Sequence, residues 1–94
     1  MDDINVISLP DKFDFGFHKE FTKRYDDSIE NFSVKEIVLD FSRVSYLDSS
    51  ALGMMVLLYR KAQACNKTVK VKNVSGKTAE ILKMANFQKL YVFE

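Results

Sequence analysis

The amino-acid sequence predicts an α/β fold: a single domain over residues 1–94, with a mixed β-sheet of four to five strands and about three helices packed on it. Segments typical of strands alternate with segments typical of helices, which favours a mixed or mostly parallel sheet. Residues 37–39 (Ile-Val-Leu) are apolar without alternation, as in a central strand covered on both faces. Ninety-four residues are too few to bury a second independent core.

The first half of the chain is expected to contain two strands and one helix. Pro10 ends the first strand because proline has no backbone N–H to donate. Asp14 can cap the helix, in which Phe17, Phe21 and Tyr25 recur at helical spacing. The expected elements are strands at residues 4–9 and 34–41, a short extended piece at 13–15, and a helix over about 16–28.

The second half is expected to contain two helices, each followed by a strand. Lysines alternate with valines over residues 68–74, as in a strand with one wetter face. Ser75 can cap the last helix, whose apolar side chains lie at helical spacing, and Asn86 can end it in a left-handed conformation. The expected elements are a helix from Ser49 or Ser50 to about residue 66, a strand at 68–74, a helix from Ser75 to about 86 and a closing strand at 90–93.

Composition and charge exclude several classes of protein. The 14 basic and 13 acidic side chains are scattered and leave a net charge of +1, so direct nucleic-acid binding is not expected. The longest apolar run, residues 51–59, is far shorter than the roughly 20 residues that span a bilayer. Residues 1–3 (Met-Asp-Asp) lack the basic and apolar regions of a secretory signal. A cytoplasmic protein without membrane insertion is therefore expected.

The residue types needed for catalysis are scarce. A catalytic serine needs a base, and the only histidine, His18, lies on a predicted helix far along the chain from Ser49. The single cysteine, Cys65, excludes an intrachain disulfide and continues the predicted core face of its helix, where it is expected to be buried. The sequence has neither a zinc-type Cys/His cluster nor a glycine-rich phosphate loop. We therefore predict that the chain is not an enzyme and has no metal or cofactor of its own.

The most informative segment is Asp48-Ser49-Ser50, at the start of the helix that follows the central strand. Backbone N–H groups there lack intrahelical partners and favour negative charge, which suits a serine that is phosphorylated and dephosphorylated. Two simpler arrangements remain open: either serine can be a plain N-cap, or Asp48 can be the cap with both serines in the first turn. A phosphate would add about −1.5 to −2 charges at pH 7, which Asp48 would repel and the helix start would tolerate.

The helix that begins at this segment is expected to be apolar on both sides. Gly53, Val56 and Leu57 fall among the polar positions, where they can receive a partner or can be ordinary exposed apolar surface. The face expected to pack on the sheet, at about 100° per residue, consists of Leu52, Met55, Leu58, Tyr59, Ala62 and Cys65.

Residues 37–41, residues 44–47 and the segment Asp48-Ser49-Ser50-Ala51-Leu52-Gly53 resemble the strand, loop and D-S-[S/T]-G-L-G helix start of STAS domains. Sulfate transporters and anti-sigma factor antagonists share this fold, and its order of elements agrees with the predicted order from residue 4 to residue 93. One departure is Ala51, where many members have glycine. The added methyl group is small and favours a helix, so the function is expected to survive.

The resemblance to stand-alone anti-sigma factor antagonists implies a partner-switching regulator of transcription. Ser49, directly after the aspartate, would then be phosphorylated, with Ser50 as the second choice. The unmodified protein would bind an anti-sigma factor or serine kinase of the GHKL type, which uses ATP to phosphorylate it. A PP2C-like phosphatase with its own metal would reverse the reaction. The residues expected to bind the partner are Asp48, Ser49, Ser50, Ala51, Gly53, Val56 and Leu57.

Two other roles are compatible with the same resemblance. The chain can be a non-switching accessory subunit of a lipid ABC transporter, in which the helix start docks constitutively and Ser49 is only a cap and a contact. It can also be a component of a sensory scaffold that assembles with other STAS proteins. The intact Asp48-Ser49-Ser50 triplet favours the switch.

Overall fold

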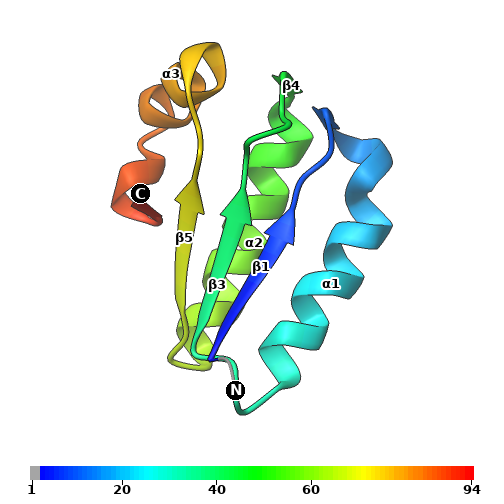
Figure 1. Ribbon diagram of the computed structural model, residues 1–94, viewed down its shortest axis with the longest axis vertical. Coiled ribbons are helices and arrows are strands. Elements are labelled where there is room, and N and C mark those ends of the chain that lie inside the picture. The colour runs from blue at the N-terminus through cyan, green and yellow to red at the C-terminus, as the bar shows by residue number, and fades with distance from the viewer. Residues whose placement is uncertain (1–2) are drawn as a thin grey trace.

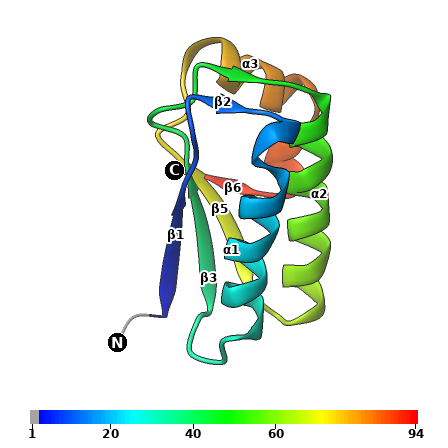
Figure 2. The same ribbon diagram turned by 90° about the vertical axis from the view of Figure 1, so that its right-hand side faces the viewer.

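Residues 3–94 are described by the computed structural model, and they form a four-stranded parallel sheet with α1 and α2 against one face (Figure 1 and Figure 2). In spatial order the sheet consists of β1 (Ile4–Ser8), β3 (Glu36–Asp40), β5 (Thr68–Lys72) and β6 (Val92–Phe93). A second, small parallel sheet joins β2 (Lys12–Phe13) to β4 (Tyr46–Leu47). The helices are α1 (His18–Glu30), α2 (Ser49–Ala64) and α3 (Gly76–Met84), with short 3-10 helices η1 (Phe15–Phe17) and η2 (Phe87–Lys89).

The predicted α/β class is confirmed, but the sheet is not mixed, because all of its strands pair in parallel. The other differences lie at the ends of elements. Asp14 caps η1 instead of the long helix, because its Oδ1 accepts a hydrogen bond from the N–H of Gly16 at 2.9 Å. The 3-10 helix delays the start of α1 to His18. It also includes Phe15, so the extended piece expected at residues 13–15 is limited to β2.

The end of α3 agrees with the prediction, whereas the start of the chain cannot be compared with it. Asn86 takes the predicted left-handed conformation, with φ of 63°, and separates α3 from η2. Met1 and Asp2, which belong to the predicted acidic start, lie outside the described residues. Within residues 3–94, no helix combines the length and the apolar character that a membrane crossing requires.

The apolar side chains of the central strand β3 are buried on both faces, as its unbroken apolar run predicted, although helices pack on only one face. Ile37 and Leu39 are fully buried under the helices, and Val38, on the opposite face, is only 4% exposed. This strand pairs with both β1 and β5, so that Val38 is the register partner of Val6 on one side and of Lys70 on the other. The buried strand therefore ties the two halves of the sheet together.

Between the sheet and the helices lies a core rich in aromatic side chains. The ring of Phe13 lies 5.2 Å from the ring of Phe21 and contacts it edge to face, and Phe21 contacts Tyr25 in the same way. Across the core, the hydroxyl of the buried Tyr91 donates a hydrogen bond of 2.8 Å to the backbone C=O of Met55. Burial raises the pKa of Tyr91 well above its ordinary value. The residues after α3 are thereby joined to the middle of α2.

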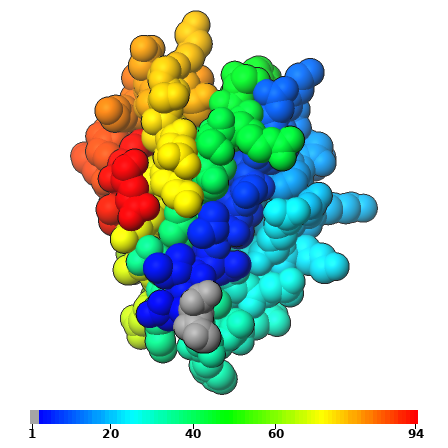
Figure 3. Space-filling view, viewed as in Figure 1, coloured from blue at the N-terminus to red at the C-terminus, as the bar shows by residue number. Residues whose placement is uncertain are grey.

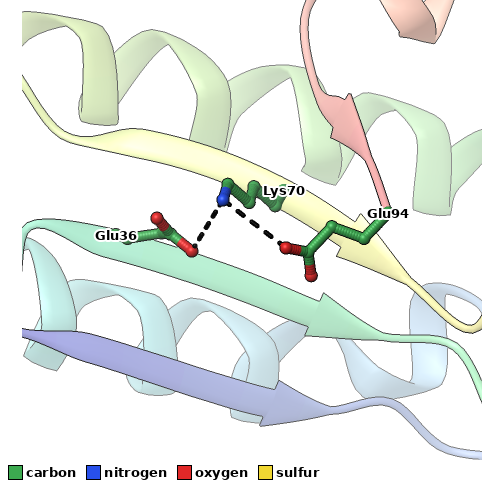
Figure 4. Close-up of polar contacts among 3 residues, drawn as sticks. All are labelled: Glu36, Lys70 and Glu94. Atoms are coloured by element: carbon green, nitrogen blue, oxygen red, sulfur yellow. Dashed lines mark hydrogen bonds and ion pairs between the residues drawn. The ribbon is translucent and has the colours of Figure 1, made fainter.

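The face of the sheet opposite the helices has charged side chains at its centre. Lys70 on β5 lies between Glu36 on β3 and Glu94, with its Nζ 3.3 Å and 3.5 Å from their carboxylate oxygens (Figure 4). The hydrogen bond to Glu36 is the main reason that the pKa of Lys70 is raised above its ordinary value. Charged side chains thus occupy this part of the face, where no helix packs.

We predict that Tyr91→Phe lowers the free energy of unfolding by about 1 kcal/mol, because it removes a buried hydrogen-bond donor without changing the packing. Urea denaturation measures this loss. Tyr59→Phe is the matched control, since the Tyr59 hydroxyl bonds only the side chain of the exposed Gln63. The control should change stability by less than about 0.5 kcal/mol. Equal stability of Tyr91→Phe and wild type would contradict a contribution from the buried bond.

Candidate functional site

The N-cap of α2 is Asp48, and both serines lie in the first turn of the helix. Asp48 has extended backbone angles, φ −119° and ψ −176°, and its side chain accepts a hydrogen bond from the N–H of Ala51 at 3.0 Å. Its backbone C=O accepts from the N–H of Leu52 at 3.3 Å, which starts the helical pattern. Of the arrangements that the sequence left open, the structure has the one in which the aspartate is the cap.

The hydroxyl of Ser49 is therefore not needed to hold the helix. Ser49 is exposed, and within residues 3–94 its side chain makes no hydrogen bond, whereas Ser50 is half-buried. The N–H groups of both serines belong to the first turn, where a helix has no internal acceptors for them. An anion on Ser49 would lie against these donors and the positive end of the helix dipole.

The small sheet positions the start of this helix. Phe13 on β2 and Leu47 on β4 are register partners and both are buried, so the residue immediately before Asp48 is anchored in the core. Next to this pair, the N–H of Ser45 donates to the backbone C=O of Asp11 at 2.9 Å. The loop before α2 is thus tied to the loop that follows β1.

A second set of bonds orders the loop at the end of β3. The carboxylate of Asp40 accepts hydrogen bonds from the side-chain amide of Asn73 at 3.0 Å and from the N–H of Ser42 at 2.9 Å. These two bonds, that from Asn73 first, hold the pKa of Asp40 below its ordinary value. The carboxyl ends of β3 and β5 are consequently joined by the bond between Asp40 and Asn73.

The predicted partner-binding residues on α2 differ in how far they are exposed. Gly53 and Leu57 are exposed, Leu57 by 47%, and Val56 is half-buried against the core. A Cβ added to Gly53 would meet no atom within 4 Å, so the surface beside it is open. Ala51 is fully buried, and its expected role as a partner contact is wrong because its side chain offers no surface.

The core face of α2 also differs from the periodic prediction. Cys65 is exposed, not buried, because α2 ends at Ala64 and Cys65 lies beyond the last helical turn. Met54 is buried although the periodicity did not place it in the core, since α2 packs beside β4 as well as on β5. Three predicted core residues are buried, namely Met55, Leu58 and Ala62, and two are half-buried, namely Leu52 and Tyr59.

The sequence analysis did not identify two exposed aromatic residues, Tyr46 and Phe15, as candidate contact residues. Tyr46, 51% exposed, precedes the buried Leu47, and Phe15, 67% exposed, follows the partner of Leu47 on β2 by two residues. For Tyr46, the signal that could have found it is an aromatic residue next to a buried one in a very short strand. Phe15 lies in η1 and stacks on the ring of His18, so strand alternation does not identify it. Within the described part of the chain, no group of three or more His, Cys, Asp or Glu side chains is arranged to hold a metal ion.

We predict that Asp48→Ala lowers the free energy of unfolding by about 0.5–2 kcal/mol, because the N–H of Ala51 loses its side-chain acceptor and keeps only the backbone C=O of residue 48. Ser49→Ala should change it by less than about 0.5 kcal/mol, since its hydroxyl caps nothing. Chemical denaturation of the two variants side by side measures the difference. A larger loss for Ser49→Ala than for Asp48→Ala would assign the cap to the serine instead.

Comparison with known proteins gives the family. A family model described as the STAS domain matches residues 1–94. A STAS-domain containing protein of Pseudomonas aeruginosa (strain UCBPP-PA14) is 35% identical over 86 residues, which are 92% of this chain and 83% of that protein.

Solved structures show the same fold at low identity. The anti-sigma factor antagonist SpoIIAA in its unphosphorylated form superimposes with a TM-score of 0.78 at 21% identity, over 100% of this chain and 81% of that one. The STAS domain of a SulP transporter from Vibrio cholerae gives a TM-score of 0.82 at 11% identity, over 100% of this chain and 75% of that one. The chain belongs to the STAS domain family.

Proposed function

We propose that this STAS protein is a partner-switching regulator of the anti-sigma factor antagonist kind, controlled by reversible phosphorylation of Ser49. One observation carries the proposal: Ser49 is exposed in the first turn of α2 with its hydroxyl uncommitted, while Asp48 does the capping. A kinase can therefore modify Ser49 without removing a bond that holds the helix. Ser50 is half-buried and remains the second choice.

The switch would act through local charge. A phosphate adds about −1.5 to −2 charges at pH 7 to a position already next to the Asp48 carboxylate. The helix dipole and the N–H groups of the first turn accommodate this charge, so the domain stays folded. A partner surface that fits the neutral hydroxyl would instead have to bury a doubly charged group, which is strongly unfavourable. Phosphorylation would thus release the partner while leaving the fold intact.

The proposed partners are an anti-sigma factor or serine kinase of the GHKL type and a PP2C-like phosphatase. SpoIIAA, which shares this fold, has been solved in unphosphorylated and in phosphorylated form, which supports a modification that the fold tolerates. The proposed contact surface, called the α2 surface below, consists of Asp48, Ser49, Ser50, Gly53, Val56 and Leu57, and the exposed Tyr46 precedes it in the chain. The chain would act in the cytoplasm, without binding nucleic acid and without a cofactor.

A second candidate is a non-switching accessory subunit of a lipid ABC transporter. The observation that favours it is the match to the STAS domain of a SulP transporter, since it indicates that the fold also serves in transport proteins. In that role the α2 surface would dock permanently, and Ser49 would carry no phosphate. The two candidates differ in one measurable respect, which is whether a negative charge at Ser49 controls binding.

We predict that Ser49→Asp folds like wild type but binds the partner at least tenfold more weakly, a loss of about 1.4 kcal/mol. Ser49→Ala should bind normally and resist phosphorylation. The partner is first identified by copurification with the wild-type chain, and affinities are then measured by calorimetry. Ser33→Asp, which places the same charge on an exposed serine between α1 and β3, is the control and should bind like wild type.

Phosphosite mass spectrometry after incubation with ATP and the partner checks the choice of serine. Loss of phosphate incorporation in Ser50→Ala but not in Ser49→Ala would move the site to Ser50. Equal affinity of Ser49→Asp and wild type would reject the switch and favour the constitutive subunit.

We predict that Leu57→Glu weakens partner binding at least tenfold while changing the free energy of unfolding by less than about 1 kcal/mol, because Leu57 is half exposed on α2. Gln63→Glu introduces the same charge at an exposed position further along α2 and should leave binding unchanged. Thermal unfolding and calorimetry are measured on the same samples. A large stability loss in Leu57→Glu would place this side chain in the core and remove it from the contact surface.

A further inference from the structure

Strand β1 has an unpaired edge. At the two ends of its pairing with β3, the C=O of Asp3 accepts from the N–H of Glu36 and the N–H of Leu9 donates to the C=O of Asp40, each at 3.1 Å. The N–H and C=O groups of successive residues in a strand point in opposite directions, so those of the odd-numbered residues of β1 point toward β3. The N–H and C=O groups of Ile4, Val6 and Ser8 consequently face outward, and among residues 3–94 they have no hydrogen-bond partner.

Nothing in β1 itself protects this edge. Exposed edges are usually blunted by lysine, by proline or by a bulge, and the sequence Ile-Asn-Val-Ile-Ser contains no charge, no proline and no bulge. Ile4 and Val6 are 48% and 44% exposed on the open face of the sheet. Figure 3 shows the side chains of β1 at the molecular surface on this face. The edge therefore combines free main-chain groups with apolar side chains.

An open groove accompanies the edge. It has a volume of about 610 Å³ between β1 and the second half of α1. Its floor is stabilised by the side chain of Asn5, which donates to the hydroxyl of the buried Ser28. The helical wall carries Arg24, which is paired with Glu20, and Asp27, which has no ion pair or hydrogen bond among the described residues. The groove thus has an uncompensated negative charge beside a strand edge.

We propose that this groove, bounded by β1 and α1, binds an extended segment of a partner protein as an added strand next to β1. Main-chain bonds to Ile4, Val6 and Ser8 would supply affinity, as in other cases of strand addition. Successive side chains of a strand point to opposite faces. The segment would accordingly place apolar side chains beside Ile4 and Val6 on the open face, and a basic side chain toward Asp27 in the groove.

The position of α1 favours a single segment over a second copy of this chain. α1 lies beyond the edge of β1, behind the plane of the sheet (Figure 1 and Figure 2). An isolated strand has no helix of its own and can lie beside β1 in the plane of the sheet, in front of α1. In a second copy that paired its own β1 with this edge, α1 of that copy would clash with α1 of the first. The groove also lies away from the start of α2, so this binding is independent of the proposed switch.

The test uses the acetylated and amidated peptide Thr-Val-Lys-Val-Thr, which has two valines on one face and a central lysine on the other. It is titrated to several millimolar into the isotope-labelled full chain, and amide shifts are followed by NMR. We expect the largest shifts at Ile4, Val6, Ser8 and Asp27. The matched peptide with glutamate in place of lysine should bind at least tenfold more weakly.

Two protein variants separate strand addition from adventitious contact. Val6→Pro removes an outward N–H that takes no part in the pairing with β3, and it should weaken binding at least tenfold. Val6→Thr keeps the N–H and should bind within about twofold of wild type. If Val6→Pro does not fold, Asp27→Lys replaces it and should reverse the preference between the two peptides. Absent shifts, shifts centred on α2, or equal binding by Val6→Pro and Val6→Thr would each overturn the proposal.

Discussion

The structure depends on the parallel pairing of the buried strand β3 with β1 on one side and β5 on the other. Parallel neighbours must be joined by crossovers, and here these crossovers are α1 and α2. The carboxyl ends of all three strands consequently lie at one end of the sheet, where the connecting loops meet. The start of α2 lies at this end, because the chain leaves β3 there and passes only through β4 before the helix begins.

At that helix start, structural and functional roles belong to different residues. Asp48 satisfies the free N–H of Ala51, Leu47 and Ala51 are buried on either side of the cap, and Ser49 is left exposed. A rigid cap and a free hydroxyl one residue apart allow a change of charge without a change of fold. This arrangement supports regulation by direct repulsion of a partner, which needs no conformational transition.

The two proposed interaction surfaces differ in their physical features: one is a helical face and the other is a strand edge. The α2 surface is a helical face with an open glycine and a half-exposed leucine beside Ser49, the proposed phosphorylation site. The edge of β1 offers main-chain groups that have no hydrogen-bond partner among residues 3–94, beside the Asp27 carboxylate, which is unpaired in the same part of the chain. The ion pairs of Lys70 keep the centre of the open face of the sheet polar, on the side opposite α2. A partner can therefore occupy either surface without covering the other.

The sequence alone determined the order and type of the main elements, because the periodicities of strands and helices are local properties. It also singled out the Asp48-Ser49-Ser50 triplet. Only the tertiary structure decided which of these residues is the cap, since aspartate and serine are equally suited to it and the backbone angles choose between them. Burial was decided in the same way. Ala51 and Met54 are buried because α2 packs against β4 as well as β5, and Cys65 is exposed because α2 ends before it. Helical spacing describes one face of an ideal helix, whereas burial depends on every neighbour that the fold brings to it.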